Sequence, residues 1–297
     1  MKRDPIQPLL QAGVYILFAG TAVFFLGWLF FNIFNLLLGS ILSVLAAALV
    51  GNFLCLRIFE DKGFEALGMP LNRGGAYNTA TGLGLGFGAA ALVLLALLLT
   101  GQVHEVRAVV SAAAPAANWR EQLFVPFLLL LGAVAEEILF RGFGFQVLLR
   151  EFGVLPAILP VGLLFGLAHG PNPHATWLAF ANTAGFGVLF CYAFVRSHDI
   201  WFPIGLHYGW NLMLLLFGAD ISGIKIRITG YEIVWNTTPL WSGGDYGPEG
   251  SVLTTGVLVL LALAIWKVRL VRQQAYVVDV VGQADAGQSA VGQKEES

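Results

Sequence analysis

Residues 9–38 read LLQAGVYILFAGTAVFFLGWLFFNIFNLLL and contain no Asp, Glu, Lys or Arg. A helix needs about 20 apolar residues to cross roughly 30 Å of hydrocarbon, so this run is long enough to span a bilayer. It is too long for the apolar region of a secretory signal peptide, and no small-residue cleavage site follows it. We therefore interpret it as a retained first membrane span.

The rest of the chain continues in the same way. The mean hydropathy of the 297 residues is +0.76, and only 11% of them are charged. A soluble domain has about a quarter of its residues charged, so lipid must replace water around most of this chain. We predict an all-α, polytopic transmembrane helix bundle of about eight spans. The spans are expected near residues 10–36, 41–58, 79–100, 122–144, 155–170, 176–195, 200–218 and 252–268.

The basic residues of the loops predict the orientation of this bundle. With the N-terminus inside the cell, and setting aside tail Lys294 and intramembrane Arg141, ten Lys and Arg lie on the cytoplasmic side and four on the opposite side. This distribution agrees with the positive-inside rule. We therefore expect both termini in the cytoplasm. The ten are Lys2, Arg3, Arg57, Lys62, Arg73, Arg150, Arg196, Lys267, Arg269 and Arg272, and the four are Arg107, Arg120, Lys225 and Arg227.

No internal repeat or linker divides the chain into separate domains. Short loops and a basic, uncleaved start suit a multi-pass protein of a bacterial inner membrane. Five segments are predicted: N-terminal transmembrane helices and loops in 1–121, core helices in 122–218, an extracytoplasmic loop in 219–251, a last transmembrane helix in 252–273, and a disordered cytoplasmic tail in 274–297.

Several function classes are disfavoured by composition. With a net charge of −2, the composition shows no excess of basic residues that would point to nucleic acid. Cys55 and Cys191 lie in apolar runs, where lone thiols usually act as small hydrophobic side chains. The glycine-rich run 82–88 lacks the spacing of a nucleotide-binding loop, and small residues four apart, such as Gly84 and Gly88, favour close helix packing instead.

The informative residues are polar groups inside predicted spans. An ionisable side chain near the bilayer centre costs at least ~2.5–3.5 kcal/mol, so it usually faces a cavity and has a function. In the fourth span, Glu137 and Arg141 are four residues apart and can pair on one helical face. Glu136 points about 100° away and has no local cation. An unpaired carboxylate in a low-dielectric pocket suits a general base, whereas the pair could simply staple two helices.

Two further spans carry imidazole groups. His169 ends the fifth span, four residues after Phe165, and His207 and Asn211 lie four apart in the seventh. His207 and Asn211 therefore share a helical face, where both can donate hydrogen bonds to a carbonyl oxygen that develops negative charge. The alternative for this pair is a polar clamp between helices.

Together these groups predict hydrolysis of a peptide bond. Glu136 with His169 would activate a water molecule, while His207 and Asn211 would hold the oxyanion. This prediction requires His169 to lie within about 10 Å of Glu136, although counting along the helix places it near the outer end of its span. A later start of that span, or a bend at Pro156 or Pro160, would resolve the difference.

The three motifs resemble those of the CPBP family of intramembrane proteases, which includes CAAX proteases and bacteriocin-processing enzymes and is also called the Abi group. The family pattern is EExxxR, then FxxxH, then HxxxN or HxxxB on successive core helices. In this chain it reads Glu136-Glu137…Arg141, Phe165…His169 and His207…Asn211, within roughly residues 122–218.

The resemblance implies the same roles for Glu136, His169, His207 and Asn211, with Glu137, Arg141 and Phe165 in support. The stretch 243–251 is also similar to a loop of many bacterial members. No cofactor follows from the residues with certainty. Glu136 and the two imidazoles would make an acceptable zinc set, yet no HExxH motif is present, so we favour the metal-free reading.

The expected partners are a peptide or protein substrate, membrane-anchored or not, and the lipid bilayer. Two other classes stay open. A proton-coupled transporter could use intramembrane Glu, His and Arg as a relay, but the repeated halves typical of transporters are not evident. A non-proteolytic membrane scaffold could also retain the fold.

Overall fold

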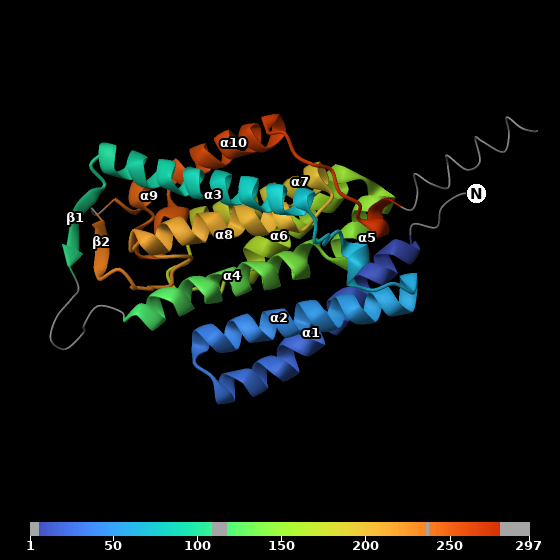
Figure 1. Ribbon diagram of the computed structural model, residues 1–297. Coiled ribbons are helices and arrows are strands. Elements are labelled where there is room, and N and C mark those ends of the chain that lie inside the picture. Colours follow the sequence, from blue (N-terminus) through green and yellow to red (C-terminus); the bar gives the residue numbers. More distant parts are fainter. Residues whose placement is uncertain (1–5, 109–117, 236–237, 280–297) are drawn as a thin grey trace, which may run out of the picture.

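The computed structural model describes residues 6–108, 118–235 and 238–279. Within these ranges the protein is an all-α bundle, which confirms the predicted fold class (Figure 1). Five helical segments are long and apolar enough to cross a membrane, and two shorter apolar helices accompany them. The exact number of spans and the side of the termini stay predictions.

Each predicted span contains a helix. Most boundaries differ from the predicted ones by a few residues, as expected where caps rather than hydropathy set helix ends. The helices are α1 (Ile6–Ile33), α2 (Leu36–Cys55), α3 (Arg73–Leu99), α4 (Trp119–Arg141), α6 (Val154–Ala168), α7 (Trp177–Ser197), α8 (Trp201–Leu216) and α10 (Val252–Lys267).

Several elements were not predicted from the sequence. The amphipathic helix α5 (Phe143–Phe152) separates α4 from α6. Two antiparallel strands, β1 (Val103–Ala108) and β2 (Tyr231–Trp235), pair with each other (Figure 1). They join the loop after α3 to the loop after α8, which are far apart in the sequence. Five short elements complete the fold, namely η1 (Leu56–Glu60), η2 (Phe64–Leu67), α9 (Pro239–Ser242), η3 (Gly244–Tyr246) and η4 (Pro248–Gly250).

The helix α3 packs closely on α8 through glycines of both helices. A Cβ atom at Gly86 would lie 1.9 Å from the carbonyl oxygen of Leu206, and one at Gly209 would lie 2.3 Å from that of Leu83. The prediction of glycine-mediated packing is therefore right in kind but wrong in its residues. A Cβ atom at Gly84 or Gly88 would have no neighbour within 4 Å. Gly82 and Gly86, on another face of the same helix, form the contact instead.

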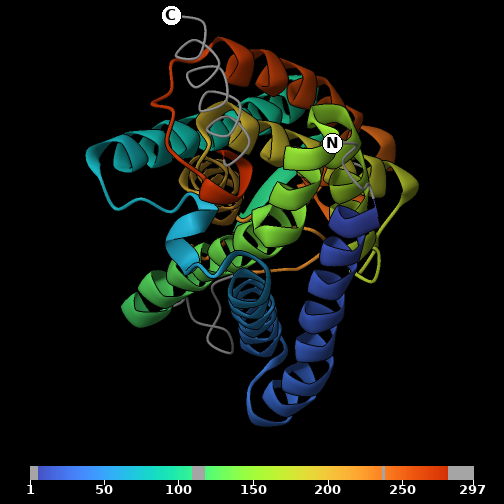
Figure 2. The same cartoon turned by 90° about the vertical axis from the view of Figure 1, so that its right-hand side faces the viewer.

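The hairpin of α1 and α2 lies on one side of the bundle, against α4 and α5 (Figures 1 and 2). At the other end of the chain, residues 276–279 form a helical turn, and Ala275 and Val277 are fully buried. The predicted disordered tail therefore begins too early at residue 274, because two of its apolar side chains complete a core cluster. Residues 280–297 lie outside the described ranges.

Asn52 of α2 fixes the junction between α4 and α5. The cap residue of α5 is Gly142, which has no side chain to accept a hydrogen bond. The Asn52 Oδ1 atom takes that place and accepts from the backbone N–H of Phe143 at 2.7 Å, while Nδ2 donates to the Ile138 carbonyl at 3.1 Å. One fully buried amide thus satisfies backbone groups at the end of α4 and the start of α5.

We expect Asn52→Leu to lower the free energy of unfolding by about 1–3 kcal/mol, because it leaves the buried Phe143 N–H without an acceptor. Unfolding in mixed micelles would measure the change. Asn32→Leu is the matched control, since Asn32 is exposed on α1 and bonds only within its own helix, to the Trp28 carbonyl. Equal stability of both variants and the wild type would contradict the role assigned to Asn52.

Candidate functional site

The four residues predicted to act together line a single cavity. Its volume is about 470 Å³, and Glu136, His169, His207 and Asn211 all contribute to its wall. They come from α4, the end of α6, and α8. The remaining wall is mainly apolar and includes side chains of α1 and α2. The structure therefore brings together all four residues, while their chemical roles stay predictions.

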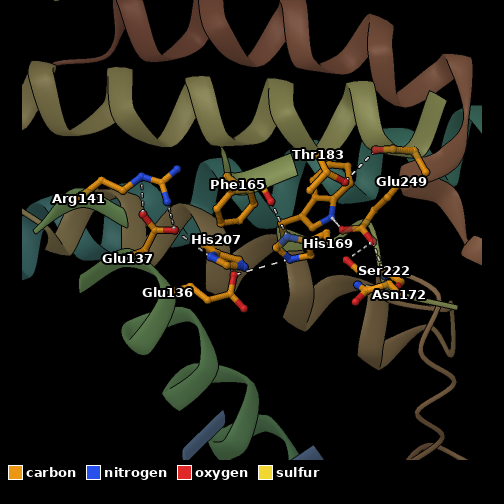
Figure 3. A network of polar contacts seen from close by, with 12 residues as sticks. Glu136, Glu137, Arg141, Phe165, His169, Asn172, Thr183, His207, Ser222 and Glu249 are labelled. Carbon is orange, nitrogen blue, oxygen red and sulfur yellow. Dashed lines mark hydrogen bonds and ion pairs between the residues drawn. The ribbon is translucent and has the colours of Figure 1, made fainter. Parts of the chain in front are cut away.

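Glu136 and His169 face each other across a short gap (Figure 3). The Glu136 Oε2 atom lies 3.8 Å from His169 Nε2, well inside the 10 Å that a joint role requires. His169 Nδ1 lies 2.8 Å from the Phe165 carbonyl oxygen. A carbonyl only accepts, so Nδ1 carries a proton, and a neutral ring has its free lone pair on Nε2. Glu136 Oε2 is buried and has no hydrogen-bond partner among the described residues.

The short length of α6 accounts for the position of His169 close to Glu136, although His169 ends its helix. The helix begins at Val154, one residue earlier than predicted, so a later start is not the explanation. Its 15 residues span only about 22 Å, less than the ~30 Å of a hydrocarbon core. A helix of this length need not reach the far side of a bilayer, and His169 is its C-terminal cap. Pro160 lies inside this helix without ending it.

Glu137 and Arg141 form the predicted ion pair, and both side chains are 0% exposed. The Arg141 Nε atom lies 3.3 Å from Glu137 Oε2, and a second guanidinium nitrogen donates to the Gly187 carbonyl at 2.8 Å. Glu137 has a further partner that the sequence did not indicate. Its Oε1 atom accepts from His207 Nδ1 at 2.9 Å, so this carboxylate also orients the imidazole (Figure 3).

The ring of His207 is fixed by packing as well. It stacks on Phe190 with ring centroids 4.9 Å apart, and Phe165 meets it edge-on at 6.1 Å. Asn211 follows one helical turn later and also lines the cavity. Phe165 contacts both imidazoles, since its ring centroid lies 4.7 Å from that of His169. Phe165 thus packs against both histidines, while its supporting role stays a prediction.

Glu249 is a cavity residue that the sequence did not single out. It is 6% exposed and accepts hydrogen bonds from Trp210 Nε1 at 3.0 Å and from Ser222 Oγ at 2.9 Å. Burial raises the pKa of Glu249, and the donors on Ser222 and Trp210 oppose that rise. Nearby, burial raises the pKa of Tyr246 to about 12. The similarity of stretch 243–251 to a family loop was the only signal for Glu249.

A zinc ion would need Glu136 and both imidazoles as ligands. In the described ranges, no group of three or more His, Cys, Asp or Glu side chains is arranged to hold a metal. Both Nδ1 atoms are already engaged, which leaves only the two Nε2 atoms and the Glu136 carboxylate. These three donors match the ligand types of a zinc site, but they are not grouped as one among the described residues. The mechanism proposed below therefore uses side chains and water alone.

The fold and the cavity define a polytopic membrane protein with a buried carboxylate–imidazole site. Residues 118–213 match the family model described as Type II CAAX prenyl endopeptidase Rce1-like. The match confirms the family resemblance inferred from the three motifs, and it supports a protease embedded in a membrane. No curated protein and no solved structure matches the chain.

The two adjacent glutamates are expected to differ in their effect on stability. Glu137→Gln should lower the free energy of unfolding by about 3–5 kcal/mol, because it leaves Arg141 as an uncompensated buried charge. Glu136→Gln should change it by less than about 0.5 kcal/mol, because this side chain is 27% exposed and only faces His169. Unfolding of both variants in the same mixed micelles tests the contrast, and similar losses would contradict it.

Proposed function

We propose that this protein is an intramembrane endopeptidase that hydrolyses a peptide bond with water activated by Glu136 and His169. The observation that carries the proposal is the 3.8 Å gap between Glu136 Oε2 and His169 Nε2. Two acceptors at this separation can each take a hydrogen bond from the same water molecule. The oxygen lone pair of that water is then free to attack a carbonyl carbon in the cavity.

His207 and Asn211 are suited to stabilise the negative charge that the carbonyl oxygen develops. The Glu137 carboxylate next to His207 Nδ1 compensates a positive charge on the ring, so His207 can carry protons on both nitrogens. Its Nε2–H group and the Asn211 amide would then donate to the oxyanion. With His207 protonated, the charges of Glu136, Glu137, Arg141 and His207 sum to zero.

The proposed reaction needs no proton donor besides the attacking water. Glu136 takes one proton as the water oxygen bonds to the carbonyl carbon, which gives a tetrahedral intermediate. Collapse of this intermediate breaks the carbon–nitrogen bond, and the proton on Glu136 passes to the leaving amine. The products are one new carboxyl group and one new amino group, and Glu136 and His169 return to their starting states.

The cavity wall also indicates the kind of substrate. Two carboxylates line it, and its described wall contains no Lys or Arg that could compensate a free C-terminal carboxylate. Apolar side chains of α1, α2 and α4 form much of the remainder. These features favour an internal bond in an apolar or lipid-anchored peptide, as in CAAX processing. A bacterial inner-membrane location with cytoplasmic termini fits the basic loops, and protease accessibility of the tail in intact cells would test it.

We expect the wild-type protein in proteoliposomes to cleave quenched peptides, with higher rates on lipid-anchored ones. Glu136→Gln should lower kcat by about 10²–10⁴-fold, because it keeps the shape of the side chain and removes the base. Glu105→Gln is the control, since Glu105 is exposed on β1 and bonds Arg107. Equal cleavage by Glu136→Gln would refute the mechanism. No cleavage by well-folded wild type would favour a scaffold or a transporter.

Cleavage is also expected to persist after metal chelation. Glu136 and His169 activate water directly in the proposed mechanism, so kcat should stay within about twofold of its untreated value. The measurement is cleavage by the same proteoliposomes after extended dialysis against a chelator, with and without added zinc. Loss of activity that zinc restores would replace the metal-free mechanism with a zinc-dependent one.

A further inference from the structure

Glu249 lies on the loop between α8 and α10, outside the matched segment 118–213. Its carboxylate lines the same cavity as Glu136 and the two histidines, at the end formed by Ser222 (Figure 3). A buried carboxylate needs strong hydrogen-bond donors to offset its lost hydration. The identity of the donors to Glu249 shows what the loop holds in place.

One donor belongs to the helix that carries the proposed oxyanion residues. Trp210 donates its indole N–H to Glu249 Oε1 at 3.0 Å. In α8 it directly precedes Asn211 and follows His207 by three residues. The indole is also packed edge-on against Phe186, with ring centroids 4.6 Å apart. A shift of Trp210 would therefore move the backbone that supports both oxyanion donors.

The other donors lead to the turn that carries His169. Ser222 donates both its backbone N–H and its hydroxyl to Glu249 Oε2. The Ser222 carbonyl oxygen accepts from Asn172 Nδ2 at 3.0 Å. The backbone N–H of Asn172 in turn donates to the His169 carbonyl at 3.0 Å. A continuous chain of hydrogen bonds thus joins Glu249 to the His169 turn.

The loop itself is fixed to the bundle independently of these contacts. Asn182 of α7 donates to the Glu249 carbonyl at 2.8 Å and to the Ser251 carbonyl at 2.9 Å. Gly243 and Gly247 have φ values of +84° and +96°, which L-residues with a side chain rarely adopt. The carboxylate of Glu249 is therefore presented from a tightly folded and anchored support.

We propose that Glu249 is a positioning residue, which clamps α8 and the His169 turn together through Trp210 and Ser222 and so sets the spacing between the water-activating pair and the oxyanion donors. The inference rests on the proposed endopeptidase function. Glu249 acts through these neighbours, so it affects the geometry of the transition state more than the binding of substrate. Loosening the clamp should lower kcat and leave KM nearly unchanged.

The test compares Glu249→Gln, Trp210→Phe, Ser222→Ala and the Glu249→Gln/Trp210→Phe double variant as full-length proteins in liposomes. Glu249→Gln keeps the shape and replaces one acceptor oxygen with a donor that faces other donors. We expect kcat to fall about 10–100-fold, as for ångström-scale misplacement of reacting groups. KM should stay roughly constant, and the double variant should lose little more than Glu249→Gln alone, because both changes loosen the same clamp.

Glu232→Gln is the matched control, because Glu232 lies on β2 of the same loop and pairs with Arg227 and Arg107. It should retain wild-type kcat. A wild-type kcat in Glu249→Gln would overturn the proposal. So would a loss of kcat in the double variant that equals the product of the losses in the two single variants. If Glu249→Gln does not fold, Trp210→Phe and Ser222→Ala decide the question, and wild-type kcat in both would overturn it.

A second measurement separates this proposal from the proposed function. Hydrogen–deuterium exchange of the backbone in residues 169–172 should be faster in Glu249→Gln than in the wild type, whatever the protein cleaves. Unchanged exchange would overturn the clamp. Absence of cleavage by the wild-type protein, with faster exchange in the variant, would overturn the endopeptidase assignment and retain the clamp.

Discussion

Glu137 and Arg141 neutralise each other where neither side chain is exposed, and His207 is held by the same carboxylate. An isolated buried charge would be costly, so the pair makes the burial of Glu137 and Arg141 tolerable and leaves a carboxylate to hold His207. Arg141 also bonds the Gly187 carbonyl of α7, which joins a third helix to α4 and α8. The same contacts therefore fix the helix arrangement and the direction of the imidazole.

The cavity is completed by segments that come from distant parts of the chain. Asn52 of α2 caps α5 and so fixes the end of α4, one turn beyond Glu137 and Glu136. The loop between α8 and α10 supplies Glu249 and Ser222 at the opposite end of the cavity. Hydrogen bonds from Asn52 and to Glu249 satisfy buried polar groups at both places, which helps a largely apolar bundle to hold a polar site.

Hydropathy and helical spacing predicted the bundle and the Glu137–Arg141 pair, because each depends on neighbours within one helix. The four cavity residues come from three helices, and they were predicted because polar groups inside apolar spans are costly and because they match three family motifs. The bond from Glu137 to His207 joins residues of α4 and α8, and no local pattern encodes it. The same applies to the face of α3 used for packing, where Gly86 rather than Gly84 meets α8. Glu249 escaped notice because its burial depends on a folded loop, which hydropathy reads as solvent-exposed.

The short helix α6 has a consequence for the surrounding lipid. Its 15 residues carry exposed apolar side chains, among them Leu155, Leu159 and Leu163. On the other side of α7, α10 has only 16 residues and likewise exposes Val259 and Leu263. A helix of about 22 Å is roughly 8 Å shorter than an average hydrocarbon core, and local thinning of the bilayer is one way to meet such a mismatch. A bilayer that is already thin would therefore cover this side of the bundle at the lowest elastic cost.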